Sequence, residues 1–349
     1  MAHEELNSLW DSVPWQEWTD SPDASSSTEV VGWYKPSVPY VKGGHELQTL
    51  DLWLPSPSLS TPSTEGEQDA PEQVLLSQKN NTANKDWIVY IHGGAWCDPH
   101  IRAHSFGFTL HHLLNKFPSA FHNIAGIASL NYTLSPSEHH GGGTPSRSGK
   151  HPDHIVDVLR GLAFIQNVAG FKENYVLLGH SCGATLAFQV LMNVARWSPS
   201  PEPPSATAKV AHVAKPSTVI GLDGLYDLPG LIKDPGEKHA RWIPEYEAFT
   251  RFAFGDNQKT WYDISPVSVK DWVAEWGPEH GTVVLVQSKD DTLVPYRQLE
   301  GMREALKPPA VDESIVVFEL PAKGDHDSLW QTGDQIAGII DEVLKRRRH

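Results

Sequence analysis

The sequence predicts a doubly wound α/β fold, in which a mostly parallel sheet carries helices on both faces. Short apolar runs recur along the chain, and such unbroken runs are typical of parallel strands buried on both sides. Between them lie segments whose apolar residues recur every three or four positions, which is the spacing of one helix face. The 349 residues are enough for one large core, although the length alone fits two small domains about as well. We start from a single α/β domain.

The first predicted strand differs from the others. Residues 45–55 (HELQTLDLWLP) alternate apolar and polar side chains, so this strand is expected to be half-buried. The remaining predicted strands are short apolar runs at residues 87–91, 124–132, 175–179, 217–222, 282–288 and 314–320. Helices are predicted by their apolar spacing at residues 154–168, 184–195 and 335–346. Because strands and helices alternate, the helices are expected to connect parallel strands.

Several segments depart from this alternation. Residues 1–33 are acidic and Ser-rich and are predicted to form a flexible or loosely docked arm ahead of one domain at residues 34–349. Two Ser- and Pro-rich stretches, 56–73 and 198–209, are predicted to be surface insertions. The segment 227–272 is dense in aromatic residues, and we expect it to form a small cap over a site.

Composition and charge exclude several partners. The chain has 43 acidic against 28 basic residues, a formal charge of -15, which disfavours binding to nucleic acid and to anionic membrane surfaces. No apolar stretch approaches the roughly 20 residues needed to cross a bilayer. There are only two cysteines, Cys97 and Cys182, and the N-terminus has no apolar leader, so we predict a cytoplasmic location.

The motif GxSxG lies where a predicted strand meets a predicted helix. Gly179, Ser181 and Gly183 form this motif within YVLLGHSCGATLAF. A serine on so sharp a turn has crowded neighbours, and glycines leave its hydroxyl clear at the carboxyl edge of the sheet. We predict Ser181 as a nucleophile. The backbone amide of Cys182, at the start of the helix, is predicted to bind an oxyanion, and its thiol is expected to be packed.

A second source of oxyanion donors is predicted in the loop YIHGGAW. This loop follows the buried strand 87–91, which is where hydrolases with a GxSxG turn place their other oxyanion amides. Gly93 and Gly94 allow the backbone to turn its amides inward. We predict Gly94 and Ala95 as the donors, with Gly93 and the imidazole of His92 supporting the loop.

Two further patterns resemble functional sites. HHGGGT, residues 139–144, matches an oxyanion motif by its letters, but polar SPSE precedes it instead of a buried strand, so we interpret it as a flexible loop. His151, His154 and Asp157 have the spacing of a metal site, but the polarity of a helix surface explains them. We therefore expect no metal at these residues.

The serine needs a base, and the base needs an acid that orients it. In this class of fold they follow the nucleophile in the order Asp, then His. Asp291 follows the strand 282–288, and Asp290 beside it is the alternative acid. His326 lies in PAKGDHDSLW, after the last predicted strand and before a helix, and is the predicted base.

These motifs together resemble one family. HGGAWCDP, SLNYTLSP, HPDHIVDVLRGLAFI, GHSCGATLAFQ, GLYDLPGL and PEYEAFTRFAFG are similar to segments of kynurenine formamidases, the arylformamidase branch of the α/β-hydrolases, and above all of the fungal members. The resemblance runs from about Tyr34 to the C-terminus and is interrupted by the two insertions. It implies hydrolysis of N-formyl-L-kynurenine to L-kynurenine and formate in tryptophan degradation, without a cofactor. The positions that match the family triad are Ser181, Asp291 and His326.

The same resemblance implies a small-molecule substrate with an aromatic ring. Trp96, Trp242, Tyr246 and Phe249 are candidates for a flat apolar slot, and ordinary core or cap packing would explain each of them as well. A homodimer is compatible with the sequence. Two alternative functions remain at this point: a general carboxylesterase that uses the same triad on small esters, and a non-catalytic binding protein on the same fold.

Overall fold

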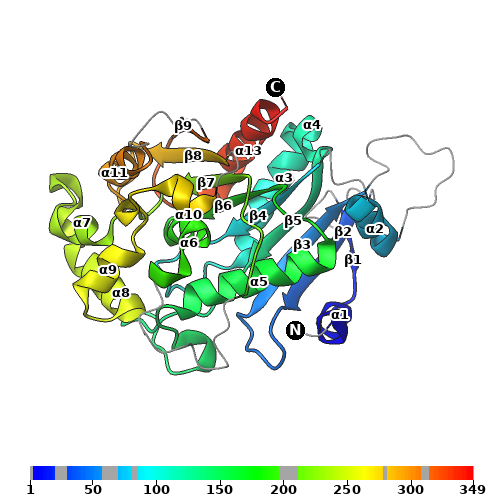
Figure 1. Cartoon of the computed structure of the whole chain (residues 1–349), viewed down its shortest axis with the longest axis horizontal. Helices are drawn as coiled ribbons and strands as arrows, with labels where there is room; N and C mark the ends of the chain where they lie inside the picture. The colour runs from blue at the N-terminus through cyan, green and yellow to red at the C-terminus, as the bar shows by residue number, and fades with distance from the viewer. Residues whose placement is uncertain are drawn as a thin grey trace.

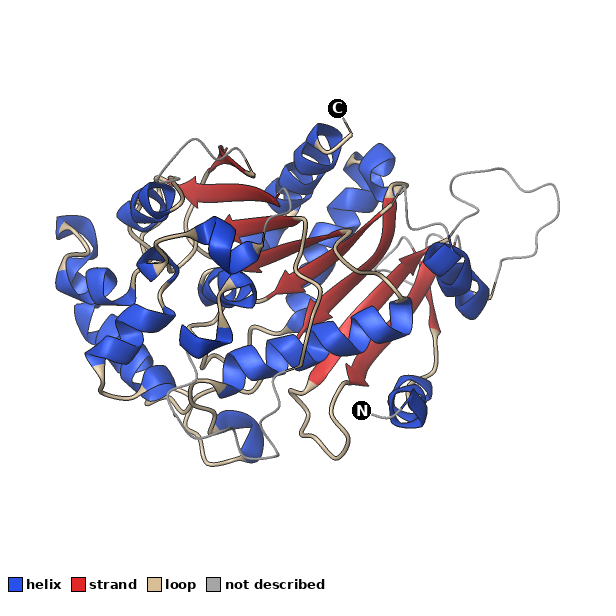
Figure 2. Cartoon of the chain, viewed as in Figure 1, coloured by secondary structure: helices blue, strands red, loops and turns tan. Residues whose placement is uncertain are grey.

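A computed structural model describes residues 3–19, 30–56, 70–80, 85–196, 211–277, 281–307 and 314–348. It contains a nine-stranded sheet with helices on both faces (Figures 1 and 2). The predicted fold class is confirmed. The predicted insertion at 198–209 and most of the insertion at 56–73 lie outside the described residues.

The sheet has an antiparallel N-terminal part and a parallel remainder. Its strands are β1 (Gln16–Thr19), β2 (Val30–Pro39), β3 (Thr49–Pro55), β4 (Asp86–Ile91), β5 (Ile124–Leu130), β6 (Tyr175–His180), β7 (Thr218–Leu222), β8 (Gly281–Ser288) and β9 (Ile315–Ala322). Their order across the sheet is β1-β2-β3-β5-β4-β6-β7-β8-β9. The pairs β1/β2, β2/β3 and β3/β5 are antiparallel, and all later pairs are parallel.

Parallel pairing brings several strand ends to one edge of the sheet. Ile91 at the end of β4 lies opposite Gly179 of β6, and His180 at the end of β6 lies opposite Leu222 at the end of β7. The end of β8, Ser288, pairs with the end of β9. The loops after these strands therefore meet at the carboxyl edge, where α/β sheets bind their ligands.

Helices cover both faces of the sheet, and each face has its own apolar core. One core receives side chains from α1 (His3–Asp11), α2 (Pro71–Asn80), α5 (Asp153–Ala169), α6 (Cys182–Leu191) and α11 (Arg297–Ala305). The other receives them from α3 (Gly107–Lys116), α4 (Pro118–Phe121), α12 (Ser328–Thr332) and α13 (Asp334–Arg346). Figure 2 shows this three-layer arrangement, with long helices in front of and behind the strands.

The predicted cap segment is helical and lies between β7 and β8. It contains α7 (Leu228–Lys233), η5 (Glu237–Trp242), α8 (Ile243–Phe254), α9 (Gln258–Ile264), η6 (Pro266–Ser268) and α10 (Trp272–Trp276). The carboxylate of Asp227 caps α7 by accepting a hydrogen bond from the amide of Gly230 at 2.9 Å. Of these helices, α7, α8 and α9 form a lobe beside the sheet (Figure 1).

One strand is more buried than its sequence pattern indicates. The run 45–55 was expected to be half-buried, but every residue of β3 is buried. Leu50, Leu52 and Leu54 face one core, while Trp53 faces the other and stacks on Tyr34 with ring centroids 5.0 Å apart. The prediction was wrong because β2 extends the sheet past β3 and both faces there are covered.

The N-terminal arm was predicted to be flexible or loosely docked on the domain. Residues 3–19 form α1 and β1, and β1 adds an edge strand beside β2. The ring of Trp10 packs against Trp15 and Phe164, and the ammonium of Lys35 donates hydrogen bonds to the carbonyls of Trp10 and Val13 at 2.7 Å each. The described part of the arm is thus docked on the domain, because its aromatic residues complete the core over α5.

We predict that Trp10→Ala destabilises the whole domain. Trp10 is only 7% exposed, so its removal leaves a cavity, which costs about 3 kcal/mol for a tryptophan in a core. Urea unfolding followed by circular dichroism measures this loss. Ser8→Ala, at an exposed position of the same helix, is the matched control and should leave the midpoint unchanged. Equal midpoints for both variants would contradict the docked arm.

Candidate active site

Ser181 lies on a strained turn between β6 and α6. Its backbone has φ 56° and ψ −123°, in a region that side-chain-bearing residues rarely adopt. A Cβ atom at Gly179 would overlap the carbonyl of Gly183, and one at Gly183 would overlap the carbonyl of Ile91. The turn is fixed by a hydrogen bond from the amide of Ser181 to the carbonyl of Leu222 at 2.8 Å. The two glycines of GxSxG are therefore a steric requirement.

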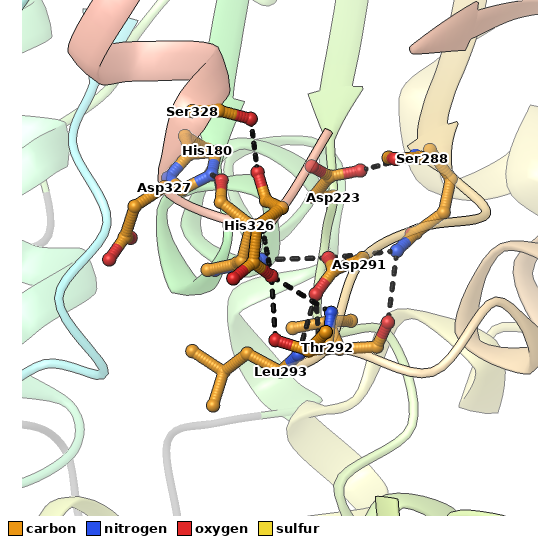
Figure 3. Close-up of polar contacts among 12 residues, drawn as sticks. His180, Asp223, Ser288, Asp291, Thr292, Leu293, His326, Asp327 and Ser328 are labelled. Carbon is orange, nitrogen blue, oxygen red and sulfur yellow. Dashed lines mark hydrogen bonds and ion pairs between the residues drawn. The ribbon is translucent and has the colours of Figure 1, made fainter. Parts of the chain in front are cut away.

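His326 and Asp291 form a buried hydrogen-bonded pair. Nδ1 of His326 lies 2.8 Å from Oδ2 of Asp291 (Figure 3). The other oxygen of Asp291 accepts hydrogen bonds from the amides of Leu293 and Val294, each at 2.7 Å, which fixes the carboxylate. The alternative acid, Asp290, is exposed. Of the two adjacent aspartates, the structure brings Asp291 to the imidazole.

The pKa of His326 is raised above its ordinary value of 6.5. Burial of the ring acts most strongly and lowers the pKa, but several carboxylates together outweigh it. Asp291 contributes both a hydrogen bond and its charge, and Asp223 and Asp327 add their charges. An imidazole in this environment is a stronger base than a free one, which suits proton abstraction from a hydroxyl group.

The loop after β4 approaches the serine with its backbone in an unusual conformation. Gly94 and Ala95 have φ 96° and 47°, and both line the same cavity as Ser181. Cys182 occupies the first position of α6, where the helix offers its amide no acceptor. Its thiol is fully buried, accepts a hydrogen bond from the amide of Trp96 at 3.3 Å, and has its pKa raised to about 12 by burial. The structure thus places the thiol in packing contacts.

His92 supports this loop through a hydrogen bond and a ring stack. Its Nδ1 lies 2.8 Å from the carbonyl of Gly93, and its ring stacks on Tyr132 with centroids 4.5 Å apart. Burial lowers the pKa of His92 to about 4, so the ring is neutral and Nδ1 donates to the carbonyl. The hydroxyl of Tyr132 donates to the carbonyls of His92 and Gly93 at 3.1 and 3.2 Å. The sequence pattern did not single out this tyrosine.

Ser181 and His326 both line one cavity of about 230 Å³. Three of the four predicted aromatic residues, Trp242, Tyr246 and Phe249, line it. Trp242 donates to the carbonyl of Thr292 at 2.8 Å, so the cap is tied to the loop that carries the acid. A larger cavity of about 550 Å³, lined by Trp18 and Trp53 among others, contains none of these side chains.

Trp96 does not line the cavity, contrary to its prediction as a substrate-binding residue. Its side chain is fully buried and packs against Phe249 and Phe254, with ring centroids 5.9 and 4.9 Å away. The left-handed backbone at this position, φ 60°, is part of the same turn as Gly94 and Ala95. Trp96 therefore packs against Phe249, which lines the cavity, without lining the cavity itself.

His154 and Asp157 of the metal-like pattern, and His140 of the loop 139–144, have different surroundings. His154 lies 2.8 Å from the hydroxyl of Ser135, whereas Asp157 accepts hydrogen bonds from Thr133 and Gln48. In the loop 139–144, His140 lines the active-site cavity, a contact that its sequence context did not indicate.

Comparison with known proteins places the chain in a family. Residues 88–339 match the model of the alpha/beta hydrolase family. A kynurenine formamidase-like hydrolase of Fusarium equiseti is 34% identical, over 88% of this chain and 93% of that protein. A kynurenine formamidase of Aspergillus versicolor is 32% identical, over 74% and 90%. The chain belongs to the kynurenine formamidase-like α/β-hydrolases. The predicted resemblance, including its fungal character, is confirmed.

Solved structures support the fold of this α/β-hydrolase. A truncated carbohydrate esterase from gut microbiota superposes with a TM-score of 0.57 at 15% identity, covering 93% of this chain and 99% of that one. At this identity the likeness concerns the fold alone. Among the helices that the structure describes, none is both long and apolar enough to span a membrane. The cytoplasmic location and the homodimer stay predictions.

We predict that Asp291→Asn lowers kcat/KM by at least about 100-fold, because an amide at this position no longer holds the imidazole in its productive tautomer. Asp290→Asn removes the same charge from the exposed neighbouring position and should stay within about twofold of wild type. Steady-state hydrolysis of p-nitrophenyl acetate compares the two variants. If Asp290→Asn caused the larger loss, the assignment of the acid would be reversed.

Proposed function

We propose that this hydrolase cleaves N-formyl-L-kynurenine to L-kynurenine and formate, with Ser181 as nucleophile, His326 as base and Asp291 as orienting acid. One observation carries the proposal. The serine on its strained turn, the imidazole paired with a buried carboxylate, and the loop of Gly94 and Ala95 share a single cavity with an aromatic wall. The Aspergillus versicolor relative, which is named a kynurenine formamidase, supports this choice of substrate.

In the first half-reaction the formyl group moves to the serine. Because Nδ1 of His326 is bonded to Asp291, Nε2 is the ring nitrogen that takes the proton of the Ser181 hydroxyl. The Ser181 oxygen bonds to the formyl carbon, and the amides of Gly94, Ala95 and Cys182 receive the negative charge on the carbonyl oxygen. The C–N bond then breaks as His326 returns its proton to the nitrogen, and the arylamine leaves.

In the second half-reaction water replaces the amine. His326 takes a proton from water, whose oxygen attacks the formyl carbon of the ester on Ser181. The bond between that carbon and the serine oxygen breaks, the proton returns to Ser181, and formic acid leaves and loses its remaining proton to water to give formate. These steps balance with the residues of this chain and water.

The cavity suits a small acyl group attached to an aromatic amino acid. A formyl group needs little room beside Ser181, and Trp242 and Phe249 provide apolar rings for the aryl group. The carboxylates of Asp98 and Glu245 also line the cavity, and we assign them to the substrate's ammonium group.

We predict that kcat/KM for N-formyl-L-kynurenine exceeds that for p-nitrophenyl acetate by about 100-fold or more, because contacts to the aryl amino acid stabilise the transition state. Absorbance-monitored turnover of both substrates by the purified protein measures the ratio. A ratio near or below one would identify a general esterase. A folded protein that cleaves neither substrate would support the non-catalytic alternative.

Glu245→Gln provides an internal check within this experiment. The variant should raise KM for N-formyl-L-kynurenine about fivefold, since it removes a charge that faces the ammonium, and should leave ester hydrolysis unchanged. Glu247→Gln, on the same helix but absent from the cavity wall, is the matched control. Equal effects of the two variants would remove Glu245 from the substrate site.

A further inference from the structure

A second buried carboxylate lies beside the proposed base. Asp223 directly follows β7, the strand between the one that leads to Ser181 and the one that leads to Asp291. Its side chain is fully buried. Oδ1 accepts a hydrogen bond from the amide of Ser288 at 2.8 Å (Figure 3), whereas Oδ2 has no hydrogen-bond partner among the described residues. A buried carboxylate oxygen without a partner is costly, so its placement needs a reason.

The carboxylate faces the imidazole of His326. An oxygen of Asp223, a ring nitrogen of His326 and a ring nitrogen of His180 all lie within 4.8 Å of one another. The backbone holds Asp223 there in a left-handed conformation, φ 44°, which is uncommon for a residue with a side chain. Its amide donates to the carbonyl of Val286 on the neighbouring strand at 2.9 Å, which fixes that conformation.

The other groups around His326 do not duplicate this carboxylate. His180, at the end of β6, donates from Nε2 to the carbonyl of His326 at 3.1 Å, and burial lowers its pKa well below 6.5, so it is neutral. Asp325 accepts hydrogen bonds from the amide and hydroxyl of Thr292 and lies near the surface. Asp327 is the next residue in the chain after His326, and its charge acts on the ring. Asp291 accepts the hydrogen bond from Nδ1 of His326. Asp223 is thus a second buried carboxylate beside the ring, and it follows a different strand from Asp291.

We propose that Asp223 is a second carboxylate for the base, a positioning residue that stabilises the imidazolium of His326 as it forms and that partly replaces Asp291 when Asp291 is neutralised. This inference rests on the proposed triad, but not on the identity of the substrate. A negative charge within 4.8 Å of a ring nitrogen, in a site screened from water, favours the protonated ring.

The titration of the two groups supports this role. Burial raises the pKa of Asp223 to about 7, and the positive charge of protonated His326 opposes that rise. Asp291 and Asp325 raise the pKa of Asp223 further by their charges, and the neutral hydroxyl of Tyr226 lies nearby. Asp223 therefore ionises most readily when His326 is protonated, which is the state reached during proton abstraction. The two groups titrate as a coupled pair.

The test is the pH profile of kcat/KM for p-nitrophenyl acetate, which requires the triad but not a formamidase pocket. Asp223→Asn keeps the acceptor for the Ser288 amide and removes the charge. We expect the acidic limb to move down by about half a pH unit or more, because the imidazolium loses a stabilising charge. The plateau should fall about 3- to 10-fold, because a weaker base remains. Asp290→Asn is the matched charge control and should move neither.

A mutant cycle separates this role from a structural one. In the Asp291→Asn background, Asp223→Asn should cost at least about threefold more than in the wild-type background, because no buried carboxylate then faces the ring. Asp223→Ser should give the same shift of the acidic limb if the asparagine variant folds poorly.

An unshifted acidic limb together with additive losses in the cycle would overturn the proposal, even if activity fell. A wild-type enzyme that cleaves the ester through Ser181 but ignores N-formyl-L-kynurenine would overturn the proposed substrate and leave this test intact. A wild-type enzyme without activity on either compound would overturn both.

Discussion

The candidate site depends on the turn at Ser181, which the backbone can make only with small neighbours. A residue held in such a conformation costs of order 1–3 kcal/mol, so the surrounding structure must enforce it. Here the enforcement comes from the sheet, since the amide of Ser181 is bonded to Leu222 on the adjacent strand. The same turn places the amide of Cys182 at the start of α6. The proposed nucleophile and one proposed oxyanion donor therefore both depend on this turn.

Most of the sheet could be predicted because its strands are locally encoded. The runs that form β4 to β8 are mainly apolar, as parallel strands buried on both faces require, whereas β9, at the edge of the sheet, is only partly buried although its run is also mainly apolar. The N-terminal part of the sheet could not be predicted in this way. β1 is short, and the burial of β3 and of Trp10 depends on contacts with β2 and α5 that no local pattern contains.

The same distinction between local pattern and distant contact applies to the residues of the site. Ser181, Asp291 and His326 belong to motifs that follow strands in a fixed order, so their approach could be predicted from the chain alone. Tyr132 and Asp223 could not be found in this way, because each matters only through a neighbour distant in sequence: Tyr132 through the loop at His92, and Asp223 through His326. For Trp96 the motif gave the position but not the direction of the ring. The left-handed backbone sets that direction.

The most direct test of the central claim is labelling of the folded protein with a fluorophosphonate probe, followed by mass spectrometry of its peptides. Such probes phosphonylate a serine only where a base and an oxyanion site activate it. The structure predicts one adduct, at Ser181, which disappears in Ser181→Ala. A folded wild-type protein that remains unlabelled, or a Ser181→Ala variant that is labelled equally, would contradict the assignment of this site.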